Sequence, residues 1–199
     1  TNYIINLGSP SLSSDAATKQ YVDDLVSTGL YYHSAVAAAT TTTLATTTGG
    51  TMTYTAPGGA GNGVGAYLST TGTFNLIDTV NVQTAGTRIL VKNEANATWN
   101  GVYVYTNTTA ITRSTDTDTY GVGSGDLSEN DYFYISGGNV NIGSAYVCNT
   151  AGTITFGTTN INFAQFSSSQ VYSNGVGLNL SGTQFSLANT AVTAASYGN

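Results

Sequence analysis

The amino-acid sequence predicts a mainly β protein, with an antiparallel barrel or sandwich domain, a short N-terminal helix and a C-terminal fibrous β strip. The first observation is a series of short runs of β-branched and aromatic residues, separated by Gly and Asn turns. The second is that only 7% of residues are charged, which disfavours long helices with a solvated face. The third is one stretch, SSDAATKQYVDDLVSTG at 13–29, that carries helix start and stop signals.

The chain is expected to divide into residues 1–30, 31–168 and 169–199. Residues 1–12 are expected to be extended. In the helix that follows, at 14–28, Ser13 or Ser14 can cap the free N–H groups and Asp15 lies at the positive end of the dipole. Gly29 is placed to end the helix.

The helix presents one apolar side, which must be covered. A helix of about 14 residues is marginal alone in water. It therefore docks either on its own domain or on copies of itself, and a pattern shorter than three heptads does not decide between them. The residues on or beside this side are Thr18, Tyr21, Val22, Leu25 and Val26.

Residues 31–168 are expected to form the antiparallel β domain. For 31–48 the run of β-branched Thr favours strand and loop over helix. Turn-rich segments at Gly49–Gly50 and 56–65 flank the first clear strand. The predicted strands lie within 51–55, 64–70, 74–82, 87–93, 101–107, 109–115, 131–137, 144–150, 152–158 and 161–166.

Residues 169–199 differ in composition from the preceding domain. Apolar and polar residues alternate over short runs, Gly177 and Gly182 interrupt them, and from 171 onward there is no charged residue. Such a segment cannot build a core alone. It is expected to form a strand-and-turn strip that buries its apolar side against other chains. Because the sequence starts at Thr1 and stops within this segment, we expect it to be a fragment of a longer protein.

Charge excludes several classes of partner. The net charge is −6, and the cations are Lys19, Arg88, Lys92 and Arg113. Phosphate backbones need clustered cations, so nucleic acid and anionic membrane are poor partners. No apolar run approaches the length of a membrane span. Cys148 is alone, so the chain can form no internal disulfide.

Residues 6–25, with the sequence NLGSPSLSSDAATKQYVDDL, resemble a junction found in the tail-fibre and tail-collar proteins of tailed bacteriophages, at which a helix follows a short extended segment. Residues 88–118, with RILVKNEANATWNGVYVYTN and ITRSTDTD, resemble the globular repeat of such fibres, and 146–166 continue it. Residues 187–199 resemble the entry into a following shaft repeat. The matches occur in the same order as in that family.

The resemblance implies a parallel homotrimer with the helix at 14–28 on its axis, so that Thr18, Tyr21, Val22 and Leu25 form the trimer interface. It implies a virion component outside the cell, a non-enzymatic segment of a fibre for host attachment. Its partners would be copies of itself, other fibre or tail proteins and a host surface glycan, with no cofactor. In the resembled family the distal tip of the fibre usually contacts the receptor. We therefore expect this chain to occupy a shaft or connector position.

An alternative from a different class is a subunit of a cellular surface filament or adhesin. It would polymerise by strand exchange through its terminal segments, 1–12 and 170–199. The low charge and the extended ends allow this alternative.

Aromatic residues are the candidates for sugar binding, because their rings stack on sugar rings. Tyr103 and Tyr105 share one face of a predicted strand, and Tyr132 and Tyr134 share one face of another. Trp99 in the loop NEANATWNG can join them. Cross-strand packing or burial at a trimer interface is the alternative role. The outward orientation of the tyrosines assumes that the opposite residues face the core, namely Val102, Val104, Phe133 and Ile135.

The stretch 114–131 concentrates five acidic residues. Carboxylates at this density can hold Ca²⁺. However, Tyr120 and Leu127 stand where a helix–loop–helix calcium site needs ligands. A solvated acidic loop without a metal is therefore expected. The acidic residues are Asp116, Asp118, Asp126, Glu129 and Asp131.

No constellation for catalysis stands out. Glycoside hydrolysis needs paired carboxylates, and no pair lies in an aromatic setting. His33 is the only histidine and has no motif around it, so it is expected to be an ordinary surface or strand residue rather than a partner for Cys148 or a serine. The sequence indicates a protein that is not an enzyme.

Overall fold

A computed structural model of the chain describes Thr18 and residues 29–167, 178–181 and 184–187. The chain divides into two compact units, residues 1–168 and 169–199. The predicted mainly β class is confirmed. The described strands form open sheets and no closed barrel.

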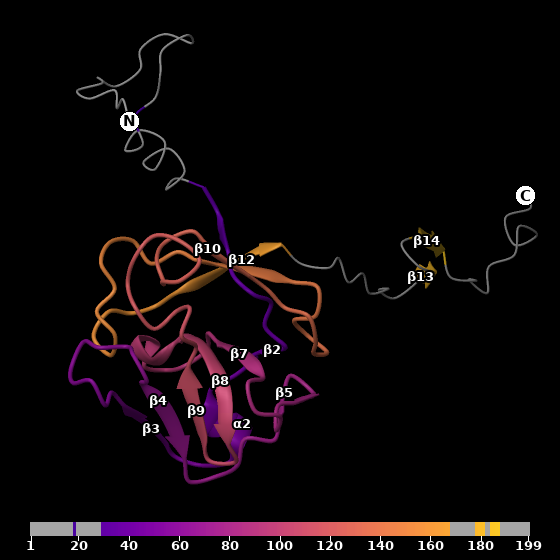
Figure 1. Ribbon diagram of the computed structural model, residues 1–199. Helices are drawn as coiled ribbons and strands as arrows, with labels where there is room; N and C mark the ends of the chain where they lie inside the picture. The colour runs from indigo at the N-terminus through magenta and orange to yellow at the C-terminus, as the bar shows by residue number, and fades with distance from the viewer. Residues whose placement is uncertain (1–17, 19–28, 168–177, 182–183, 188–199) are drawn as a thin grey trace, which may run out of the picture. The chain divides into compact units, whose positions relative to one another are not determined.

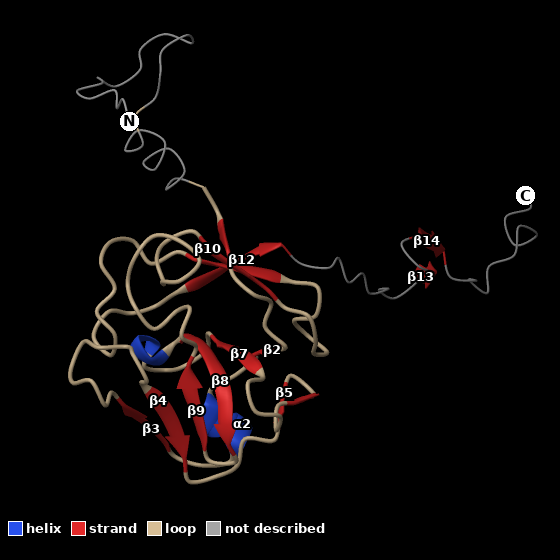
Figure 2. Cartoon of the chain, viewed as in Figure 1, coloured by secondary structure: helices blue, strands red, loops and turns tan. Residues whose placement is uncertain are grey.

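The first unit contains a six-stranded sheet, seen in the lower half of Figure 1 and as red arrows in Figure 2. All neighbouring strands are antiparallel except β2, which runs parallel to β7. The order is β2 (Ala38–Ala39), β7 (Arg88–Val91), β8 (Gly101–Asn107), β9 (Ala110–Arg113), β4 (Tyr67–Thr70), β3 (Met52–Thr55).

The first unit also contains a four-stranded sheet, which lies on the opposite side of the unit from the six-stranded sheet (Figure 1). Its order is β1 (Tyr31–Tyr32), β10 (Asp131–Tyr134), β11 (Ala145–Cys148), β12 (Phe163–Ser167). β1 runs parallel to β10, and the other pairs are antiparallel. The first and last strands described in this unit therefore form the two edges of one sheet.

Short elements complete the two units. In the first, they are the hairpin of β5 (Leu76–Ile77) and β6 (Val80–Asn81), the helix α2 (Leu44–Thr48) and the 3₁₀ turn η1 (Ala97–Trp99). In the second, β13 (Leu178–Ser181) pairs antiparallel with β14 (Gln184–Leu187).

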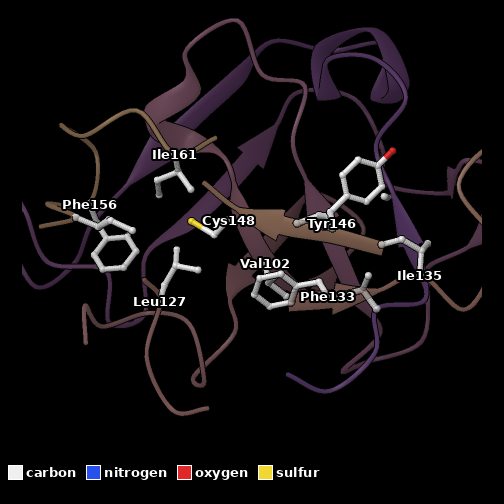
Figure 3. Packing of buried hydrophobic residues seen from close by; sticks show 12 residues of the cluster. Val102, Leu127, Phe133, Ile135, Tyr146, Cys148, Phe156 and Ile161 are labelled. Carbon is white, nitrogen blue, oxygen red and sulfur yellow. The ribbon is translucent and has the colours of Figure 1, made fainter. Parts of the chain in front are cut away.

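One face of the six-stranded sheet is covered along its strands, and the other face is buried where β2, β7 and the start of β8 lie. Along β7, Leu90 contributes to a cluster shared with the four-stranded sheet, whereas Ile89 and Val91 contribute to a second cluster on the opposite face. Figure 3 shows the first cluster, where Val102 of β8 lies among side chains such as Phe133 and Cys148. The second cluster is closed by α2 and the segment 74–82, through Leu44, Phe74, Ile77 and Val82.

The expectation of strand and loop for 31–48 is wrong in part, because α2 forms within it. Thr43 caps this helix, with its side-chain oxygen accepting from the backbone N–H of Thr46. Gly49 ends it in the left-handed region, at φ 69°. Leu44 is fully buried. The burial of one leucine and two good caps outweigh the low helix propensity of the Thr run.

The predicted strand at 152–158 is also wrong. Gly152 and Gly157 both have φ 76°, so the chain turns at each end of the segment. Within it, Phe156 makes an isolated bridge to Gly61. Ile154 and Phe156 nevertheless pack into the first core cluster.

Asp78 connects the β5–β6 hairpin to the loop between β10 and β11. It lies in the turn with Thr79, and both residues have positive φ, 46° and 70°. Its carboxylate accepts from the backbone N–H groups of Asn139, Val140 and Asn141 at 2.8 to 3.1 Å. A single ionised group thus satisfies three donors of a loop that has no regular partner strand.

We expect Asp78→Asn to lower the free energy of unfolding by about 1–2 kcal/mol, because the amide accepts fewer of these bonds and carries no charge. Asn tolerates the positive φ, so the change isolates the carboxylate. Urea unfolding measures the difference. The matched control is Glu129→Gln at an exposed glutamate, which is expected to cost under about 0.5 kcal/mol. Equal effects of the two changes would contradict the role of Asp78.

Candidate functional site

The structure does not bring the five aromatic candidates into one site. Tyr103 is fully buried and Tyr105 is nearly so, which makes their predicted outward orientation wrong. Both pack in the second core cluster, because the face of β8 opposite Val102 is covered as well. A ring enclosed in this way has no free face for a sugar. The outward orientation of Tyr132 and Tyr134 is confirmed, with Phe133 buried between them.

Tyr132 and Tyr134 belong to a larger surface, here called the aromatic face, which consists of Tyr32, Tyr132, Tyr134 and Phe166. Tyr32 is 67% exposed, Tyr134 44% and Phe166 60%. The ring of Tyr132 lies 4.9 Å from that of Tyr32 and 5.8 Å from that of Phe166, measured between centroids. The aromatic face thus runs across the four-stranded sheet from β1 to β12.

Sequence reasoning missed Tyr32 and Phe166. The run INFAQF at 161–166 contains one isoleucine and two phenylalanines, which favours a strand. Nothing in it indicates that β12 pairs with β11 and so carries Phe166 beside Tyr132. That neighbourhood depends on strand pairing over long sequence separations.

Trp99 lines a separate concave site, here called the Trp99 pocket, of about 420 Å³. The Trp99 ring lies nearly parallel to that of Tyr54, at an angle of 16° and a centroid distance of 6.3 Å. The backbone oxygen of Trp99 accepts from the Tyr103 hydroxyl at 2.6 Å. The remaining lining residues are Thr43, Ala45, Gly50, Thr51, Met52, Glu94, Ala95 and Asn96.

Glu94 is the charged group of this pocket. Its Oε1 accepts from the backbone N–H of Leu44 at 2.6 Å. Its own backbone N–H donates to Asn100 Oδ1 at 3.1 Å. Burial raises the pKa of Glu94, and the bond from Leu44 opposes that rise. The carboxylate is therefore held in place at the N-terminus of α2.

A second pocket, of about 480 Å³, lies where the Gly-rich segment 58–63 meets Asp118, Thr119 and Tyr120. Asp118 is nearly buried, and burial raises the pKa of its carboxyl group. Gly63 is required there because a Cβ would collide with the backbone oxygen of Asp118. The sequence placed Asp118 in a solvated loop, and for this residue the prediction is wrong.

His33 is also placed differently from the prediction, since its side chain is fully buried. Its Nδ1 lies 3.4 Å from Asp116 Oδ2, and its Nε2 lies 3.4 Å from Asp131 Oδ2. Its ring stacks on Phe133 at 4.7 Å. Asp116 also accepts two hydrogen bonds from Arg88, both at 2.9 Å. Here His33, Asp116, Asp131 and Arg88 are called the charged cluster.

The pKa values of His33, Asp116 and Asp131 are shifted from their usual ranges. Burial lowers the pKa of His33, but the two carboxylates outweigh burial and raise it to about 9. Burial raises the pKa of Asp116, whereas the bonds from His33, Arg88 and Ser114 lower it more, to well below its usual range. Burial raises the pKa of Asp131, partly opposed by His33. A protonated His33 is thus the bridge between two carboxylates.

The acidic residues of 114–131 do not converge on one point. Asp116 and Asp131 contact His33, whereas Asp126 accepts from the Thr119 hydroxyl. Within the described residues, no group of three or more acidic, His or Cys side chains is arranged to hold a metal ion. Cys148 lies in the first core cluster, and burial raises the pKa of its thiol to about 11.

The predicted trimer residues lie almost entirely outside the described part of the chain. Tyr21, Val22 and Leu25 lie outside the described residues, as does the helix expected at 14–28, apart from Thr18, which is half-buried. In the part that the structure describes, no helix is both long enough and apolar enough to cross a membrane. No protein-family model, curated protein or solved structure matches this chain.

The charged cluster predicts a specific pH dependence of stability. The pKa of His33 is 6.5 unfolded and about 9 folded, so its contribution is complete below pH 6.5 and is lost as pH rises through 9. The loss between pH 6 and pH 9.5 is expected to be up to about 3 kcal/mol. Urea unfolding at the two pH values measures it.

His33→Gln is the control for this prediction, because His33 is the only histidine of the chain. The variant is expected to be less stable at pH 6 and to lose most of the difference between the two pH values. A wild-type protein equally stable at both pH values would contradict the charged cluster, as would a variant that keeps the full difference.

Proposed function

We propose that this chain is a structural, non-enzymatic segment of a trimeric tail fibre of a bacteriophage, exposed on the virion and contributing to host attachment. The proposal begins from the resemblance of residues 6–25, 88–118 and 146–166 to that class. The observation that carries it further is the aromatic face, which lies on the one sheet that contains both terminal strands of the first unit.

A fibre segment needs a surface that meets its neighbours along the axis. Among the described residues of the first unit, β1 is the first strand and β12 the last, and they are opposite edges of the four-stranded sheet. The aromatic face spans the same sheet, with three of its four rings more than 40% exposed. A contiguous apolar surface of this kind is typical of interaction sites. Its proposed occupant is a second copy of the chain.

The mechanism is mechanical and multivalent. Three parallel copies present three copies of every surface on a stiff rod, so weak contacts add through effective concentration. Other fibre or tail proteins would join at the ends of the segment. No cofactor or turnover is required.

A surface filament that grows by strand exchange is the second candidate. The observation that favours it is that β12, within the described residues, has β11 as its neighbour on one side and forms an edge of the sheet on the other. An edge strand of five residues can accept a strand from another chain.

Light scattering on the full chain and on a chain that begins at Tyr31 distinguishes these assemblies. We expect a mass of three chains for the full sequence, reduced on removal of residues 1–30, because the predicted helix contributes to the axis. A monomer in both cases would contradict the fibre proposal. An open-ended distribution of large masses would favour the filament.

A second prediction concerns the aromatic face itself. We expect the double change Tyr134→Lys and Phe166→Lys to shift the full chain towards monomer, because it places two charges in each apolar contact. The control is Val140→Lys, at a side chain that is 66% exposed and outside the aromatic face. Light scattering and circular dichroism follow mass and folding together. An unchanged mass for the double variant would exclude this face from the interface.

A further inference from the structure

The Trp99 pocket is a preformed concave site that lies within a single chain. It opens beside the N-terminus of α2, between that helix, the start of β3 and the loop 94–99. Its volume of about 420 Å³ falls in the range typical of small-molecule sites. The pocket differs from the aromatic face in its residue types, because it combines one large ring with several groups able to form hydrogen bonds.

Trp99 is held rigidly in this site. Asn96 caps the 3₁₀ turn, its Oδ1 accepting from the backbone N–H and hydroxyl of Thr98 at 3.2 and 2.8 Å. The Tyr103 hydroxyl, from the middle of β8, donates to the Trp99 carbonyl. These bonds fix the backbone at Trp99, and the indole ring packs beside Tyr54 and against the second core cluster. The ring is therefore positioned before any ligand arrives, which lowers the entropic cost of binding.

Glu94 supplies a fixed acceptor. One carboxylate oxygen is occupied by the Leu44 N–H, which orients the group along the wall of the pocket. A carboxylate accepts strong, charge-assisted hydrogen bonds from hydroxyl groups. Thr43, Thr51 and Asn96 add neutral polar groups, and Ala45 and Met52 add apolar surface.

The charge of the Trp99 pocket indicates which class of ligand it can bind. Among the described residues that line the pocket, Glu94 is the charged one and none is Lys or Arg. Phosphorylated and carboxylated ligands would therefore meet repulsion without compensation. A flat ring with C–H groups on one face and hydroxyl groups at its edge matches an indole beside a carboxylate.

We propose that the Trp99 pocket binds a neutral sugar in the pyranose form, with the sugar ring stacked on Trp99 and a hydroxyl donating to Glu94. This inference goes beyond the fibre proposal, because the pocket needs only one chain. Sugar titration and light scattering can therefore fail independently of each other.

Trp99 is the only tryptophan, so fluorescence excited selectively for tryptophan over tyrosine reports on this pocket. The probes are D-glucose, D-galactose and N-acetyl-D-glucosamine, titrated into the full chain, with N-acetylneuraminic acid as an anionic comparison. At least one neutral sugar is expected to give a saturable change with a dissociation constant on the order of 1 mM, as is usual for so small a ligand. The anionic sugar is expected to bind at least about tenfold more weakly.

Glu94→Gln is the diagnostic variant, because it keeps the shape and an oxygen for the Leu44 N–H. It is expected to weaken binding roughly tenfold or more, since a charge-assisted bond becomes a neutral one. The matched control is Glu129→Gln, the same change at the only other glutamate, which lies exposed outside the pocket. Its binding is expected to equal that of the wild type.

Thr51→Phe provides a second variant, because Thr51 lines the pocket and is exposed, so a large side chain fills the site without entering the core. It is expected to abolish the titration while leaving the thermal midpoint unchanged. Saturation-transfer NMR on the same samples detects sugar bound anywhere on the chain. Binding seen by NMR without a Trp99 response would overturn the proposal, as would equal loss in both Gln variants, or no saturable response to any neutral sugar.

Discussion

The architecture depends on one constraint, which is that the six-stranded sheet is covered on both faces where β2, β7 and β8 lie. A sheet in that position needs apolar side chains on both sides of its strands, and β7 and β8 provide them through residues such as Leu90 and Val102 on one side and Ile89 and Tyr103 on the other. Even Arg113 of β9 lies inside, stacked over the rings of Tyr103 and Phe156 at 4.9 and 4.7 Å. Gly101 leaves room for it, because a Cβ there would collide with the guanidinium.

The four-stranded sheet differs from the six-stranded one in having an exposed outer face. The aromatic face and the Trp99 pocket therefore lie on different parts of the molecule. Only the inner face of the four-stranded sheet is buried, through Phe133, Cys148 and their neighbours. Its outer face carries the aromatic face, which extends from β1 to β12. The Trp99 pocket lies instead beside the second core cluster, next to α2. Assembly and ligand binding, as proposed, therefore use different layers and need not compete.

Outside the two hydrophobic clusters, charged side chains form contacts between the layers. His33 follows β1, Asp131 begins β10 and Arg88 begins β7, so the charged cluster joins both sheets through Asp116. Asp78 makes a second connection, from the β5–β6 hairpin to the loop after β10. Breaking a buried ionic contact leaves an uncompensated charge, so such groups report sensitively on the integrity of the fold.

The sequence by itself determined the mainly β class and many strands, since β8 occupies the predicted 101–107 and Phe133 alternates with outward tyrosines as period two requires. It could not determine which faces are covered. Alternation in β8 separates Val102 from Tyr103 but does not indicate that both sides are buried, so it predicts an outward orientation for Tyr103 and Tyr105, which are in fact buried. Likewise, His33 lies 83 residues from Asp116 along the chain, and Trp99 meets Thr51 only through the packing of loops. Local periodicity is a property of the chain, whereas burial and the meeting of distant side chains are decided by how the layers pack.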